Sequence, residues 1–378
     1  MGSTKKVAFP GPGYYHSRSS MLTSGTARLL AVTALLIGLS WAGFAQSAIT
    51  SLGPPLSPQC AQSQVLLEAG EARLDKKDYS DAIHQFQSAL KLCPDSQQAR
   101  LDLTLAYLKA RRFTEAERSA QAVMAEDSAS EGAQLMLADS YFMQQKFQQA
   151  GKTLQKLLAQ DPHNADAHKL MGLTLFFYKQ YVMAEDELRA ALRLRPHDEE
   201  ALYSLGRIYY TQNNFPPAIA AFRRLIELDP NHYKAYNNLA LCYEAIRKDR
   251  EAEAMFKKAQ QLAQKFAPDD DWPYANLAAM FLKEGKVEEA LPYLQQALRI
   301  NSTSARDFCL MGEALLRKGQ VHQALGYLRQ SVKLDPGYAQ PHYLLGQAYE
   351  KLQAPAQAQR EFKLFQKLSE QQSVGGSP

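Results

Sequence analysis

The chain has 378 residues, with 43 lysines and arginines against 39 aspartates and glutamates and a formal net charge of +4. Residues 1–45 hold four bases and no acid, and subtracting those four leaves 39 basic and 39 acidic residues. A nucleic acid or an anionic membrane surface usually requires a basic stripe, so this balance argues against either as the main partner.

Residues 1–45 have the composition of a leader. The first 20 residues are rich in Gly, Pro, Ser and Tyr, which favours disorder. Arg28 then precedes an apolar run over residues 29–39 and a small-x-small end at Gly43-Phe44-Ala45. These are the three parts of a secretory signal peptide, and they predict cleavage directly after that end. Met21 is an alternative start, because the residues before it are foreign to the signal pattern.

An uncleaved anchor is the competing interpretation of the same segment. No charged residue occurs between Arg28 and Glu68, and the apolar stretch over residues 29–49 is nearly long enough to span a bilayer. In both interpretations the folded part is exported. We expect it to be periplasmic or secreted, or anchored by residues 29–49 as the only membrane contact.

The stretch from residue 61 to residue 370 repeats one plan about nine times. A small residue recurs in steps of 34, with one step of 38, at Gly70, Thr104, Ala138, Gly172, Gly206, Ala240, Ala278, Gly312 and Gly346. Twelve residues after each comes an alanine, at Ala82, Ala116, Ala150, Ala184, Ala218, Ala252, Ala290, Ala324 and Ala358. Three residues after the small residue the chain is mostly aromatic, and a proline closes most copies. We interpret the first two columns as the crossing of two antiparallel helices, where larger side chains would wedge the backbones apart.

This pattern resembles the tetratricopeptide repeat family over roughly residues 61–370. The resemblance implies an all-α fold, a right-handed superhelical solenoid of nine 34-residue helix-turn-helix TPR repeats. The Pro-rich residues 46–60 are expected to form an extended linker before it, and residues 371–378 a disordered tail.

The sixth repeat departs from the common length. It carries four extra residues between Ala252 and Pro268, which predicts about one more turn in its second helix. Three consecutive acids follow, at residues 269–271. We interpret them as a solvated turn, and a contact for a basic partner is the alternative. In two later repeats Gly285 and Gly319 are expected between the paired helices in the left-handed conformation.

Cysteines and histidines give little sign of chemistry. A helical hairpin brings the start of its first helix beside the end of its second, so Cys60 and Cys93 either form a disulfide in an oxidising compartment or stay free. Cys242 and Cys309 lie two repeats apart, too far to bond. The eight histidines do not cluster, and no metal-binding, phosphate-binding or catalytic motif is present. We therefore expect no enzyme activity, no cofactor and no metal.

The resemblance also implies a concave groove lined by the first helices of the repeats. Transferred to this chain, the family's groove positions are occupied by Met136, Phe142, Met143, Leu170, Leu173, Phe176, Phe177, Tyr203, Arg207, Tyr210, Lys234, Asn237, Asn238, Trp272, Asn276 and Arg306. Exposed aromatic and Met side chains at this density are typical of a surface for a peptide or an amphipathic helix, and Asn can hold an extended backbone. The alternative is that Phe176 and Phe177 only close a tighter superhelix.

One specialised binding mode of the family is missing. The members that bind chaperone tails use a two-carboxylate clamp of Lys and Asn, then Asn, then Lys and Arg. Asn238 matches the middle element, but Tyr203 and Arg207 stand in the first repeat, and Trp272 and Asn276 in the third. The clamp is therefore absent.

The last helix offers a second candidate surface. It carries Phe362, Leu364, Phe365 and Leu368 with no polar capping helix after it, so the sequence raises the hypothesis of a homo-oligomer formed through the C-terminal repeat. The combined interpretation is a non-enzymatic scaffold of the cell envelope that binds a protein or peptide in its groove. The alternative is an accessory or assembly subunit of an envelope enzyme or secretion complex.

Overall fold

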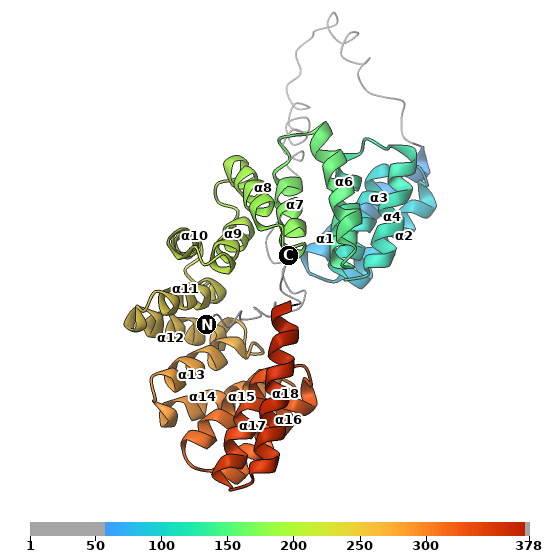
Figure 1. The fold of residues 1–378 in the computed structure, drawn as a ribbon. Coiled ribbons are helices and arrows are strands. Elements are labelled where there is room, and N and C mark those ends of the chain that lie inside the picture. Colours follow the sequence, from blue (N-terminus) through green and yellow to red (C-terminus); the bar gives the residue numbers. More distant parts are fainter. Residues whose placement is uncertain (1–56, 375–378) are drawn as a thin grey trace, which may run out of the picture. The chain divides into compact units, whose positions relative to one another are not determined.

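The computed structural model describes residues 57–374, and all regular structure in this part is helical (Figure 1). It contains eighteen α-helices arranged as helix-turn-helix pairs, which confirms the predicted all-α repeat fold. The predicted signal segment, most of the predicted linker and residues 375–378 lie outside the described residues.

The chain divides into two compact units at residues 153 and 154, within α6. Unit 1 contains α1 (Pro58–Asp75), α2 (Tyr79–Leu92), α3 (Gln97–Lys109), α4 (Phe113–Glu126), α5 (Glu131–Met143) and the start of α6 (Phe147–Gln160). Unit 2 continues with α7 (Ala165–Phe177), α8 (Tyr181–Leu194), α9 (Glu199–Thr211), α10 (Phe215–Leu228), α11 (Tyr233–Ala245), α12 (Asp249–Phe266), α13 (Trp272–Lys283), α14 (Val287–Ile300), α15 (Ala305–Arg317), α16 (Val321–Leu334), α17 (Ala339–Lys351) and α18 (Pro355–Val374).

Both predicted ends of the repeat region differ from the structure. The first helix begins at Pro58, inside the predicted linker, because Ser57 caps it by accepting the Cys60 N–H at 3.2 Å and proline is well suited to the first helical position. The last helix continues to Val374, into the predicted tail. Val374 is also the last residue that the structure describes.

The small residue and the alanine of each repeat lie at helix crossings, as predicted. Eight of the nine alanines are 0% exposed and Ala358 is 3% exposed. A Cβ atom added to Gly206 would lie 2.7 Å from the Phe222 ring, and one added to Gly172 would lie 2.7 Å from Leu188. Glycine is therefore required here for close helix approach.

The turn inside each repeat contains one residue with positive φ, seven positions after the small residue. Gly285 and Gly319 take this place with φ of 78°, as predicted. In the other repeats the same place is held by Lys77, Arg111, Gln145, Lys179, Asn213, Arg247 and Gln353. The repeat therefore sets a left-handed turn even where no glycine is present.

A second column of contacts joins consecutive repeats through the aromatic position. The tyrosine hydroxyl in the first helix of one repeat accepts a hydrogen bond from the second helix of the repeat before it. The pairs are Gln87 with Tyr107, Gln121 with Tyr141, Arg189 with Tyr209, Arg223 with Tyr243 and Arg329 with Tyr349. Where Phe281 lacks a hydroxyl, the Lys257 ammonium instead lies 5.8 Å from its ring centre.

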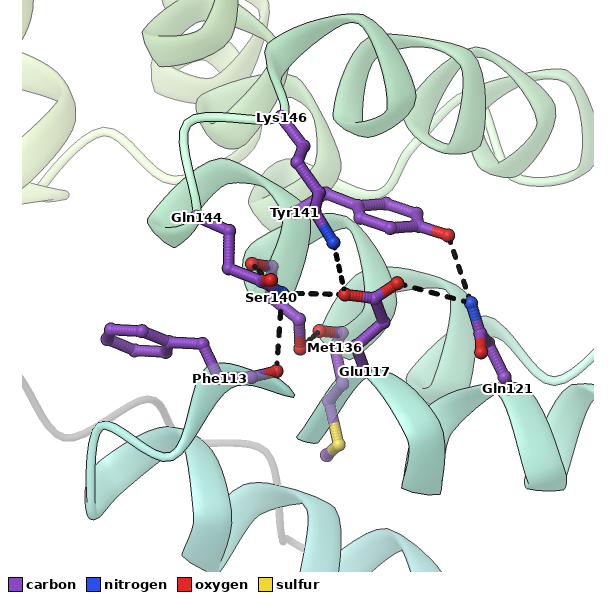
Figure 2. Close-up of polar contacts among 8 residues, drawn as sticks. All are labelled: Phe113, Glu117, Gln121, Met136, Ser140, Tyr141, Gln144 and Lys146. Carbon is purple, nitrogen blue, oxygen red and sulfur yellow. Dashed lines mark hydrogen bonds and ion pairs between the residues drawn. The ribbon is translucent and has the colours of Figure 1, made fainter. Parts of the chain in front are cut away.

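Figure 2 shows this contact in unit 1, where Glu117 on α4 gathers several donors. Its carboxylate accepts from Gln144 at 2.7 Å and from Lys146 at 2.8 Å, and Gln121 bonds the Tyr141 hydroxyl at 3.1 Å. Burial alone would raise the pKa of Glu117, but these hydrogen bonds outweigh it and hold the pKa below its ordinary value. The network ties α4 to α5 and to the turn after it.

We expect Tyr243→Phe to lower the free energy of unfolding of unit 2 by about 1 kcal/mol, because Arg223 then loses its acceptor at 3.1 and 2.6 Å. Chemical denaturation measures this loss. Tyr236→Phe is the control, since its hydroxyl makes no hydrogen bond within the described residues, and it should change stability by less than about 0.5 kcal/mol. Equal effects of the two substitutions would refute the inter-repeat bond.

The sixth repeat has a longer second helix than the other inner repeats. The second helix of the sixth repeat, α12, has 18 residues whereas α10 has 14, which confirms the predicted extra turn.

At one edge of the first repeat Cys60 and Cys93 form a disulfide. Cys242 and Cys309 are buried free thiols, and burial raises the pKa of each to about 12.

The C-terminal helix uses its aromatic residues inside the last repeat. Phe362 and Phe365 lie with their ring centres 5.9 and 5.3 Å from that of Tyr343 on α17. A shallow hollow on α18 is lined instead by Ala356, Gln359, Arg360, Lys363, Leu364 and Lys367. Phe362 and Phe365 therefore pack on α17, but they stay half-buried, as do Leu364 and Leu368, so the hypothesis of a homo-oligomer through this helix stays a prediction. Within residues 57–374, no helix is both long enough and apolar enough for a membrane crossing.

Candidate functional site

The predicted groove residues of unit 1 lie on α5. Met136, Phe142 and Met143 are half-buried there, and the Phe142 ring meets Phe147 of α6 edge-on at 5.6 Å. These side chains form a small apolar group within unit 1.

The predicted groove residues of unit 2 are less exposed than their sequence suggests. Phe177 is 40% exposed, whereas Phe176, Tyr210 and Trp272 are half-buried. Those with at most 9% exposure are Leu170, Tyr203, Arg207, Asn237, Asn238 and Asn276. The interpretation of these side chains as a densely exposed surface is therefore wrong. Neighbouring first helices pack closely, so side chains at these positions reach across and contact one another.

The contacts between first helices begin with stacking of Arg207. Its guanidinium, on α9, lies 5.5 Å from the ring centre of Phe176 on α7 and 5.6 Å from that of Tyr203. A guanidinium over aromatic faces is stabilised by the ring quadrupole, more strongly when water is excluded. Arg207 is only 9% exposed, so this contact holds its guanidinium in one orientation.

Two asparagines of α11 continue the contacts. Asn238 donates its Nδ2 to the Tyr203 hydroxyl at 3.2 Å and to the Lys234 carbonyl at 2.8 Å. Its neighbour Asn237 accepts from Asn276 Nδ2 on α13 at 2.9 Å. In the described part of the chain, the Asn238 Oδ1 and Asn237 Nδ2 atoms have no partner, and both keep contact with solvent. One acceptor and one donor on consecutive residues of α11 therefore remain unused within the described part of the chain.

The contacts end on α15. Arg306 donates to Asn276 Oδ1 at 2.6 Å, and its guanidinium lies 4.8 Å from the ring centre of Trp272. The contacts thus run without a break over α7, α9, α11, α13 and α15. We call the set the polar ladder: Phe176, Tyr203, Arg207, Asn237, Asn238, Trp272, Asn276 and Arg306.

Charged groups of both signs lie beside the polar ladder. Burial lowers the pKa of Lys234, Asp270 opposes that change, and the nearby charge of Arg207 lowers the pKa further. Arg306 adds a third cation. Asp270 is held by the Tyr233 hydroxyl at 2.7 Å and by the Trp272 N–H at 3.1 Å. The arrangement therefore offers hydrogen-bonding groups together with charges of both signs.

The sequence did not predict that the three acids before α13 differ in burial. Asp269 is exposed as expected, but Asp270 is half-buried and Asp271 is 8% exposed. The solvated-turn interpretation is therefore wrong for two of the three, because Tyr233 of α11 bonds to Asp270 and Asn301 at the end of α14 bonds to Asp271. The sequence pattern also gave no sign of the role of His232. Its Nδ1 caps α11 by accepting the Ala235 N–H at 3.1 Å, and burial lowers its pKa.

The site contains hydrogen-bonding amides, stacked rings and cations, which are suited to holding a ligand. In residues 57–374, no three side chains of His, Cys, Asp and Glu gather in a way that could hold a metal ion.

Comparison with known families gives one consistent result. Three models described as tetratricopeptide repeat match residues 107–173, residues 232–303, and residues 67–131, 180–232 and 309–369. Together they cover most of the chain. No curated protein sequence matches it.

Solved structures resemble the chain in fold. A chain of the APC/C hetero-tetramer Cut9–Hcn1 matches at 16% identity and a TM-score of 0.59, over 78% of this chain and 57% of that one. A structure described as a functional characterisation of Pseudomonas aeruginosa pilF matches at 23% identity and 0.50, over 61% and 99%. A tetratricopeptide repeat protein from Parabacteroides merdae matches at 17% identity and 0.52, over 67% and 98%. This chain spans little more than half of the Cut9–Hcn1 chain, and at these identities the likeness concerns the fold alone.

Proposed function

The chain belongs to the tetratricopeptide repeat family of protein-interaction scaffolds, and we propose that it is a non-enzymatic scaffold whose polar ladder holds an extended segment of a partner protein. The partner is a protein or peptide, and the chemistry of the complex, if any, belongs to that partner.

The observation that carries this proposal is the pair of unused amide atoms on α11. Asn238 Oδ1 can accept a backbone N–H, and Asn237 Nδ2 can donate to a backbone carbonyl. An extended chain presents both groups at every residue, so it can bond to both amides whatever its side chains are. The remaining bonds of both asparagines hold them in place before any ligand arrives, which lowers the entropic cost of binding.

The direct test compares recovery of partner proteins from the native host with wild-type bait and with Asn237→Ala/Asn238→Ala bait. We expect the double variant to recover at least about tenfold less of the specific partner, because two backbone bonds of about 1 kcal/mol each are lost. Asn214→Ala is the matched control, since this exposed asparagine makes no side-chain capping bond.

Recovery must be compared only between baits with the same melting curve. Equal recovery with the double variant and with wild type would show that the polar ladder does not bind the partner.

We propose further that the scaffold works outside the cytoplasm, in the cell envelope. The support is the signal-like pattern over residues 28–45, which lie outside the described residues, together with the Cys60–Cys93 disulfide of unit 1, a bond typical of oxidising compartments. Sequencing the N-terminus of the chain isolated from its host distinguishes a cleaved signal from an uncleaved anchor. A start at Gln46 means a cleaved signal, and an intact start with membrane retention means an anchor.

A homo-oligomer through the C-terminal repeat remains a proposal with narrower support. The outer side of α18 shows a basic hollow around Arg360, Lys363 and Lys367, rather than the two phenylalanines. These cations would repel the same hollow of a second copy, so a pairing surface would have to lie beside them. Sedimentation of the purified chain at several concentrations tests self-association.

A further inference from the structure

The last repeat holds one half of a contact that joins the other repeats. Wherever the next repeat has an aromatic residue in its first helix, the side chain five positions after the alanine contacts that ring or its hydroxyl. The pairs are Gln87–Tyr107, Gln121–Tyr141, Arg189–Tyr209, Arg223–Tyr243, Lys257–Phe281 and Arg329–Tyr349. Lys363 takes this position on α18, and within residues 57–374 no helix follows that could offer it a ring.

Lys363 is the middle one of three cations on α18. Arg360, Lys363 and Lys367 follow one another at spacings of three and four residues, so they lie on one face of the helix, and all three are exposed. They line the basic hollow described above. None of the three makes a hydrogen bond or an ion pair with another described residue. The positive charge of this face is therefore not balanced within the described part of the chain.

Two inner repeats balance the corresponding cation on its own helix. Arg189 pairs with Glu185 at 2.9 Å, and Lys257 pairs with Glu253 at 2.6 Å, in each case an acid one turn earlier. On α18 the residue one turn before Lys363 is the neutral Gln359.

The acid closest in sequence to these cations is already engaged. Glu361 lies 2.6 Å from the His342 Nδ1 atom of α17. The basic hollow therefore has three cations and no acid in its lining, and a negatively charged partner complements it.

A leucine gives the basic hollow an apolar part. Leu364 lies six positions after the alanine, and it is half-buried. The other eight repeats have a small or polar residue at this position, namely Ser88, Ala122, Lys156, Ala190, Arg224, Lys258, Gln296 and Gln330. Leu364 and Ala356 line the hollow beside the cations. An apolar strip beside charged groups suits an amphipathic helix.

We propose that the basic hollow binds a helix of a partner protein, with an aromatic side chain against Lys363 and acidic side chains against Arg360 and Lys367. This helix stacks on α18 as the first helix of a following repeat would. The aromatic residue follows from the six contacts between repeats, because a cation is attracted to a ring face. The acids follow from charge complementarity. The surface lies on α18, outside the polar ladder, and does not depend on it.

A second copy of this chain does not fit the basic hollow. The helix of a second copy that would stack on α18 in the same way is α1, and it has Arg73 in the aromatic column. Arg73 already pairs with Asp78 at 3.5 Å and with Asp81 at 3.4 Å in its own repeat. It would place a cation opposite Lys363, and like charges in contact oppose binding. The occupant is therefore a different protein.

Site-specific photo-crosslinking of the full chain in its native host identifies the occupant. The probe replaces Gln359, which is exposed and lines the basic hollow. We expect one adduct, with a segment of another protein that carries several acids and an aromatic residue at helical spacing. The control probe replaces Gln357, which is exposed on the same helix but does not line the hollow, and it should give no such adduct.

The crosslinked segment, made as a synthetic peptide, then tests the contacts. Lys363→Glu/Lys367→Glu should weaken its binding to the purified chain at least about tenfold, because like charges then face each other. Alanine in place of the aromatic residue of the peptide should also weaken binding. Lys91→Glu, an exposed site that corresponds to Lys367 in the first repeat, should leave binding unchanged.

The proposal fails in four cases. These are no adduct at position 359, an adduct with a second copy of this chain, an adduct with lipid, and equal peptide binding by wild type and the charge-reversed variant. Asn237→Ala/Asn238→Ala should keep the adduct at position 359, so failure of the polar ladder and failure of the basic hollow give different results.

Discussion

Replacing Ala184 with leucine lowers the melting temperature of unit 2 by about 3–10 °C, because it forces three extra carbon atoms into a helix crossing that has no free space. Ala184 is 0% exposed, and its carbonyl oxygen lies 3.1 Å from where a Cβ atom on Gly172 would be. The backbones of α7 and α8 therefore touch at this point. Overpacking of such a site costs about 1–3 kcal/mol.

A matched substitution on the same helix separates crowding from hydrophobicity. Asp186 is exposed on α8, so Asp186→Leu adds an apolar side chain without entering the crossing. We expect it to change stability by less than about 0.5 kcal/mol. An unchanged melting curve for Ala184→Leu would contradict the packing described for every repeat, since the same alanine recurs in all of them.

Loss of the Cys60–Cys93 disulfide should lower the stability of the first repeat by about 2–4 kcal/mol. The bond joins the start of α1 to the end of α2, and Ser63 fastens the same edge by donating to the Ala89 carbonyl at 2.9 Å. The first repeat has a described neighbour on one side, so it depends on local fastening more than an inner repeat does. Amide hydrogen exchange in α1 and α2 should accelerate after reduction.

Two comparisons keep this result specific. Cys60→Ser/Cys93→Ser should match the reduced wild type, and exchange in unit 2 should not respond to reduction, because Cys242 and Cys309 are free thiols. Slow exchange of α1 that persists after reduction would show that packing alone holds the first repeat.

The repeat core was predictable because its causes are local and recur. Ala184 and Gly172 form a crossing within one helix pair, and eight further copies show the same spacing. The left-handed turn was predicted only where it carries glycine, at Gly285 and Gly319. Sequence alone did not reveal it at residues such as Lys179, because the conformation there is imposed by the helices on both sides.

The sequence predicted where the residues of the candidate site lie, but it did not predict how deeply they are buried. The groove positions placed Asn237, Asn238 and Asn276 on neighbouring first helices, but their burial depends on side chains from the next repeat. The burial of Asp271 was missed, since an acid before a helix looks like an ordinary cap. The buried acid Asp307 could have been noticed in the sequence, because most other repeats have alanine at the same position. The difference becomes visible only when the repeats are aligned with one another.

The most direct test of the binding account is site-specific photo-crosslinking in the native host. The probe replaces Phe177, the 40% exposed residue beside the polar ladder, and the control probe replaces Gln155, an exposed residue on α6. A discrete adduct at position 177 with none at position 155 is the predicted result, and mass spectrometry of the adduct then identifies the bound segment. Equal adducts at both positions, or none at position 177 while the partner still co-purifies, would contradict binding along the first helices of unit 2.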